Sequence, residues 1–96
     1  MGIFDRIFGR RNQSPEEAMI RRNIQAIGLH HFPDDEGAKW KIDSIQFENG
    51  VYLVETSPVP HVGYTRIRFH LRNPSIDGVK SADYWENGEW SQLFSS

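Results

Sequence analysis

The sequence predicts an α+β domain in which one N-terminal amphipathic helix packs on a roughly five-stranded antiparallel β-meander, preceded by a short amphipathic N-terminal segment. Three observations lead to this fold class. A capped helical pattern opens the domain, hydrophobic patterns of period two follow it, and two Asn-Gly pairs mark tight hairpins. Because the connections are too short to hold a crossover helix, a parallel sheet is disfavoured.

Length and composition indicate one globular domain. The chain has 96 residues, of which 38% are hydrophobic and 25% charged, values close to the globular average. We divide it into an amphipathic segment, 1–13, and a single α+β domain, 14–96. The formal net charge of −2 disfavours nucleic acid as the main partner. With no cysteine, no long apolar run and no secretory signal pattern, we expect a cytoplasmic protein.

The first helix is predicted over 15–27. Ser14 has the position of an N-cap, Pro15 stands at the first helical position, and Glu17 completes a capping box. Gly28 is typical of the residue that follows a helix, so we expect the helix to end there. Apolar residues spaced four and three positions apart form one stripe along it, at Ile20, Ile24 and Ile27.

A change of phase marks the first strand. Trp40 and Ile42 alternate with polar residues, and Ile45 and Phe47 alternate one position out of phase with them. A β-bulge at 43–44 would return all four side chains to one face of the sheet. We therefore predict a bulged strand whose four apolar side chains share one face.

Two hairpins follow from the Asn-Gly pairs. Asn49-Gly50 leads into a strand at 51–56, and Asn87-Gly88 joins strands at 79–86 and 89–94. With two-residue loops, an aromatic residue lies opposite another across each hairpin: Phe47 opposite Tyr52, and Trp85 opposite Trp90.

The segment 57–61 contains two prolines, so we expect no ladder pairing there. A third strand is predicted at 64–72 and a turn at 73–78. One sheet face would then carry the apolar side chains that the helix stripe covers: Ile45, Phe47, Tyr52, Val54, Ile67, Phe69 and Leu71.

Four basic side chains share the other face of the third strand, at period two: Arg66, Arg68, His70 and Arg72. Guanidinium groups in such a ladder can bind phosphates or carboxylates, which makes these the candidate protein- or anion-binding residues. The alternative is that they face solvent and pair across strands with Glu55, Glu48 or Glu86. Among aromatic residues, Tyr84 is the expected neighbour on this face.

Segment 1–13 carries an apolar helical stripe at Ile3, Phe4, Ile7 and Phe8, and three arginines at Arg6, Arg10 and Arg11. These are the candidate membrane- or partner-contact residues. Burial of the stripe is nearly balanced by the entropy lost on ordering, so at an anionic membrane it predicts a weak, reversible anchor. The alternatives are packing on the protein's own sheet and a frayed terminus.

Catalytic and metal-binding patterns are lacking. The run at 29–37 holds His30, His31, Asp34, Asp35 and Glu36, but adjacent histidines followed by acids in a loop indicate a solvated turn. The sequence has no glycine-rich phosphate loop and no nucleophile elbow. Nothing singles out an acid–base pair among Asp43, Asp83, Glu55 and His70. We therefore predict no enzyme activity, no metal and no cofactor.

The sequence favours a small, non-catalytic binding or adaptor module that engages another protein. The expected surface combines the arginine face with the N-terminal stripe, and Arg68→Glu is expected to weaken partner capture with little change in melting temperature. A second interpretation is a peripheral protein at the inner face of a membrane, attached through segment 1–13. A third is a ligand-binding or catalytic pocket between helix and sheet that uses His70 or Asp83. Homo-oligomer formation is compatible with all three.

Overall fold

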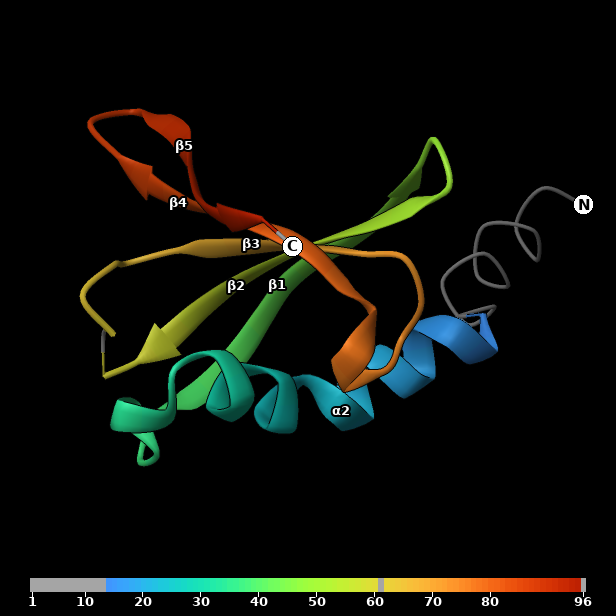
Figure 1. Ribbon diagram of the computed structural model, residues 1–96, viewed down its shortest axis with the longest axis horizontal. Coiled ribbons are helices and arrows are strands. Elements are labelled where there is room, and N and C mark those ends of the chain that lie inside the picture. Colours follow the sequence, from blue (N-terminus) through green and yellow to red (C-terminus); the bar gives the residue numbers. More distant parts are fainter. Residues whose placement is uncertain (1–13, 61, 96) are drawn as a thin grey trace, which may run out of the picture.

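The computed structural model describes residues 14–60 and 62–95, and it confirms the predicted α+β fold. One long helix lies along one face of a five-stranded antiparallel sheet whose strands are ordered in space as in the sequence (Figure 1). The predictions for segment 1–13 lie outside the described residues. The elements are α2 (Pro15–His31), η1 (Pro33–Asp35), β1 (Lys39–Glu48), β2 (Val51–Val59), β3 (Ile67–Leu71), η2 (Ile76–Gly78), β4 (Val79–Glu86) and β5 (Glu89–Ser95).

The N-cap and the first residue of α2 are as predicted, but the Glu17 side chain does not complete the predicted capping box. The Ser14 hydroxyl accepts a hydrogen bond of 3.1 Å from the backbone N–H of Glu17, and Pro15 occupies the first helical position. Glu16 and Glu17 lie in the first turn, where negative charge complements the helix dipole.

The prediction that Gly28 ends the helix is wrong, because α2 continues to His31. Gly28 is buried inside the helix, and a Cβ built on it would overlap the indole of Trp40. The glycine therefore allows the indole to approach the helix backbone, which is a packing role and not a capping one. The helix ends one turn later, where the Phe32 N–H donates to the Gly28 carbonyl over 2.8 Å.

The core lies between α2 and the predicted sheet face, but the prediction that the helix stripe covers Phe47 is wrong, because this residue lies at the hairpin end of β1 and is 62% exposed. The helix stripe is at most 3% exposed, so its three isoleucines are removed from water almost completely. Each such side chain contributes about 1.5–3 kcal/mol of hydrophobic stabilisation. The stripe and the fully buried sheet residues opposite it are Ile20, Ile24, Ile27, Val54, Ile67, Phe69, Leu71 and Ala82.

The predicted bulge in β1 is confirmed. Ile42 pairs with Thr56 and Ser44 with Glu55, so Asp43 is the extra residue. Both hairpins are confirmed as well, since Asn49 and Asn87 have φ of 53° and 55° and the following glycines φ of 79° and 80°. These left-handed angles define the tight turn that matches strand twist. The predicted aromatic pairs form, with ring centroids 4.6 Å apart for Phe47–Tyr52 and 5.2 Å for Trp85–Trp90.

The prediction that pairing stops after Thr56 is wrong, because β2 reaches Val59 and Pro58 pairs with Trp40. The ladder tolerates this proline because both backbone polar groups of Trp40 bond to Gln25 and so point away from β2. The third strand is correspondingly shorter than predicted, covering Ile67–Leu71 only.

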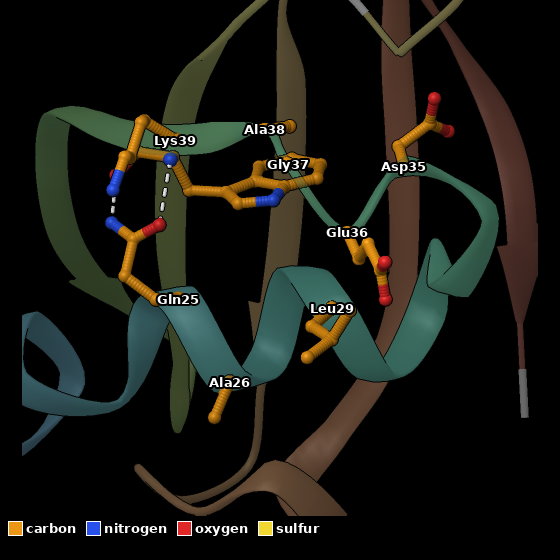
Figure 2. A pocket seen from close by; sticks show the side chains of 9 residues that line it. Gln25, Ala26, Leu29, Asp35, Glu36, Gly37, Ala38 and Lys39 are labelled. Atoms are coloured by element: carbon orange, nitrogen blue, oxygen red, sulfur yellow. Dashed lines mark hydrogen bonds between the residues drawn. The ribbon is translucent and has the colours of Figure 1, made fainter.

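Gln25 completes the free edge of β1. Its side-chain amide donates to the Trp40 carbonyl over 2.7 Å and accepts from the Trp40 N–H over 2.8 Å (Figure 2). The carboxamide thus makes the two hydrogen bonds that a neighbouring peptide group would make, and it ties α2 to the edge strand. Within residues 14–60 and 62–95, no helix combines the length and hydrophobicity that crossing a membrane requires.

Gly28→Ala is expected to lower the free energy of unfolding by about 1–3 kcal/mol, because the new methyl group overlaps the Trp40 indole. Gly37→Ala is the matched control, since a Cβ there meets nothing within 4 Å. Urea denaturation of both variants checks this. Equal stabilities of the two variants would contradict the close approach.

His31 makes the core sensitive to pH. Its ring stacks on Phe94 at a centroid distance of 5.0 Å, and its buried Nε2 has no hydrogen-bond partner among the described residues. Desolvation by burial, and secondarily the neighbouring His30, lowers the pKa of His31 below 6.5. The unfolded chain therefore takes up this proton first as the pH falls. The stability that neutral His31 contributes is therefore fully present above pH 6.5, and it is lost as the pH falls from 6.5 toward the lower pKa of His31 in the folded state.

His31→Leu is expected to reduce the loss of stability between pH 7.5 and pH 5, because it removes a group that the folded state resists protonating. Urea midpoints of the variant and the original chain at both pH values measure the difference. An identical pH dependence in the two proteins would show that His31 does not contribute.

Candidate functional site

The arginine face lies on the side of the sheet away from α2, as the period-two pattern predicted. Buried and half-buried residues alternate strictly along β3. Arg68 and His70 therefore point away from the core, and Arg66 continues the pattern just before the strand. No other described element covers this face (Figure 1).

Arg66 is held by one carboxylate and two aromatic rings. Its Nη2 donates to Oε1 of Glu55 over 2.6 Å. Its guanidinium carbon lies 5.2 Å from the ring centroid of Trp85 and 5.2 Å from that of Trp90. Such contacts combine electrostatic attraction to the ring faces with stacking, and they fix the plane of the guanidinium group.

Asp83 organises the centre of the face. Its Oδ2 accepts hydrogen bonds from Arg68 Nε at 3.1 Å and Arg68 Nη2 at 2.9 Å. The same oxygen lies 2.7 Å from Nε2 of His70. Arg68 also lies over the ring of Trp90, 4.5 Å from its centroid. One carboxylate thus joins two basic side chains on β3 to the aromatic pair of the β4–β5 hairpin.

The sequence offered ion pairs with acids on neighbouring strands as the alternative to ligand binding. Such ion pairs are present for Arg66 and Arg68. Glu55 was among the acids expected from the sequence, but Asp83 was not expected as a partner. Alternation along β4 puts Asp83 on the same face as Trp85, two residues later, but it does not say which face that is. The position of Asp83 opposite Arg68 depends on the β3–β4 register, which no local pattern in segment 73–78 fixes.

The aromatic residues of the face are Trp85 and Trp90, and the prediction for Tyr84 is wrong. Tyr84 pairs with Ile67 and so lies on the helix side, with its ring 4.6 Å from that of Tyr64. Trp85 lies opposite Arg66, whose carbonyl accepts a hydrogen bond of 3.1 Å from the Trp85 N–H. Both tryptophans are half-buried although none of the described elements lies over them.

Arg72 does not join this cluster. It lies beyond the end of β3, is exposed, and forms no salt bridge with a described residue. The candidate metal ligands do not converge: the rings of His30 and His31 lie 4.8 Å apart, but His31 turns into the core while His30 stays exposed. Across the described ranges, no group of three or more His, Asp or Glu side chains is placed to hold a metal ion.

The surface of the described residues is hollowed at two places that bear on function. One, of about 310 Å³, lies between α2 and the start of β1, beside Gln25 and Leu29 (Figure 2). The other, of about 390 Å³, adjoins the arginine face. Its lining combines apolar and polar side chains from four strands and one turn: Glu48, Asn49, Val51, Leu53, Arg68, His70, Lys80 and Ser81.

The residues expected to serve a pocket between helix and sheet lie elsewhere. His70 and Asp83 face away from α2, and the helix–sheet interface is filled by the apolar core. Ser81 is opposite His70 in the ladder, but no hydrogen bond joins their side chains. Because Asp83 is also shared with Arg68, this trio lacks the contacts that activate a serine nucleophile.

The arrangement is suited to recognition. Ion pairs hold the guanidinium planes of Arg66 and Arg68 in place, and both groups keep N–H donors beyond those bonded to Glu55 and Asp83. Comparison with protein-family models, with curated proteins and with solved structures finds no match.

The expectation that Arg68→Glu leaves melting unchanged needs revision, because a carboxylate at position 68 would face Asp83. The variant is expected to lower the free energy of unfolding by about 1.5–3 kcal/mol, through lost charged hydrogen bonds and repulsion. Arg72→Glu, outside the cluster, is expected to change it by less than about 0.5 kcal/mol. Thermal melts of the two variants test this, and similar melting temperatures would contradict the network.

Proposed function

We propose that this protein is a non-catalytic binding module that engages another protein through its open sheet face. We call the contact surface the arginine–tryptophan face, formed by Arg66, Arg68, Trp85 and Trp90. One observation carries the proposal: two guanidinium groups stack on two indole rings on a face that no described element covers. A cytoplasmic setting is part of the proposal.

The residue types favour a protein partner. Tryptophan and arginine are the side chains that most often dominate the energy of protein interfaces, where they occupy the desolvated centre. Both tryptophans are already half-buried, and Glu55 and Asp83 hold the arginines in place. Because these side chains are ordered before contact, binding would cost less conformational entropy than at a surface of free arginines.

The charge balance of the face favours a protein over a phosphate polymer. Glu55 and Asp83 offset the positive charges of Arg66 and Arg68, and the whole chain has a formal charge of −2. Nucleic-acid binding depends on uncompensated positive charge. The surface is best matched by a partner that offers apolar area together with carbonyl or carboxylate acceptors for the remaining guanidinium N–H groups.

Affinity capture from soluble extract with three baits tests the proposal: the original chain, Trp90→Ser and Leu29→Ser. Trp90 supports both arginines, so its loss is expected to reduce retention of a specific partner at least about tenfold. Leu29 is the matched control, because it is 45% exposed and lies on α2 beside the other depression.

Melting curves of the three baits establish that each is folded at the capture temperature. A partner that Trp90→Ser retains as well as the original chain, while Leu29→Ser loses it, would transfer the binding surface to α2 and contradict the proposal.

A further inference from the structure

On the side of the sheet that α2 covers, the β1–β2 hairpin carries an aromatic pair in which Tyr52 is half-buried and Phe47 is exposed. Phe47 is 62% exposed, and its ring centroid lies 4.6 Å from that of Tyr52. Single exposed apolar residues are ordinary. This pair is different because it continues the core: Tyr52 pairs with buried Leu71, and Phe47 follows Ile45, which packs against the core, at period two.

The pair lies near the start of α2. Burial raises the pKa of Tyr52, and the carboxylates of Glu16 and Glu17 raise it further, while a side-chain hydrogen bond with Ser14 acts in the opposite direction. These three residues form the N-cap and first turn of the helix. The aromatic pair is therefore close to the residue at which segment 1–13 joins the domain.

The sequence of that segment matches the surface in chemistry and reach. Its apolar stripe is followed by the five residues 9–13, which can span up to about 17 Å when extended. Its arginines have the opposite charge to Glu16 and Glu17 at this end of the domain. Tethering also gives the stripe an effective concentration in the millimolar range, which a separate molecule does not have. The matching residues are Ile3, Phe4, Ile7 and Phe8 for the stripe, and Arg6, Arg10 and Arg11 for the charge.

We propose that the Phe47–Tyr52 pair is the docking site for the chain's own residues 3–8, which extend the apolar layer on the helix side past Ser14. This assigns the stripe to the face opposite the arginine–tryptophan face. The two surfaces are then separate, and the docking does not depend on the proposed function.

Limited trypsin digestion of the full chain tests the docking through the rate of cleavage after Arg6, which lies inside the stripe. Phe47→Asp is expected to raise this rate about tenfold, because cleavage follows the population of the undocked segment. Val59→Asp is the matched control: Val59 is 59% exposed and lies at the opposite end of β2. Its cleavage rate is expected to equal that of the original chain.

Equal cleavage rates in Phe47→Asp and the original chain would overturn the docking. Co-sedimentation with phosphatidylglycerol vesicles gives an independent result, since release of the stripe in Phe47→Asp is expected to increase vesicle binding over that of the original chain. Strong vesicle binding by the original chain that Phe47→Asp leaves unchanged would assign the stripe to lipid and overturn the proposal. A dimer of the original chain in sedimentation velocity that Phe47→Asp converts to monomer would do the same.

Discussion

The contact between α2 and the edge strand β1 determines how the rest of the molecule is arranged. Gly28 removes the one side chain that would hold the helix away from Trp40, and Gln25 bonds to both backbone polar groups of that tryptophan. Packing and hydrogen bonding thus act on the same residue from adjacent turns of the helix. They fix the position of α2 along the sheet, and they leave one face of the sheet closed and the other open.

The open face follows from this asymmetry. An antiparallel sheet covered on one side places alternate residues in contact with solvent, and here those residues are basic and aromatic. Asp83 orders these side chains because it accepts hydrogen bonds from Arg68 and contacts His70. Glu55 accepts a hydrogen bond from Arg66 in the same way. The acids lower the net charge of the surface but fix its shape. Shape and ordered donors favour recognition of a folded partner over attraction to a phosphate backbone.

Features encoded by neighbouring residues could be predicted from the sequence. The Ser14 cap, the bulge at Asp43 and both Asn-Gly turns depend on local backbone chemistry, and each has the predicted form. Features that depend on contacts distant in the sequence could not. Gly28 has the pattern of a helix end, and only the position of Trp40 shows that it serves packing.

The candidate site likewise has features that the sequence predicted and features that it could not predict. Alternation placed Arg66, Arg68 and His70 on one face, because that inference needs only the period of a strand. The partner Asp83 and the side taken by Trp85 required the register between β3 and β4, which a 3₁₀ turn and a bulge at His70/Leu71 set.

The most direct test of the account is oxidative footprinting of the full chain in buffer and in soluble extract, with modification read at individual side chains. The account predicts that Trp85 and Trp90 are modified in buffer and protected in extract, while the exposed α2 residues Met19 and Leu29 react equally in both. Protection of Met19 and Leu29 with unchanged modification of the two tryptophans would contradict it, and would place the binding surface on the helix side of the molecule.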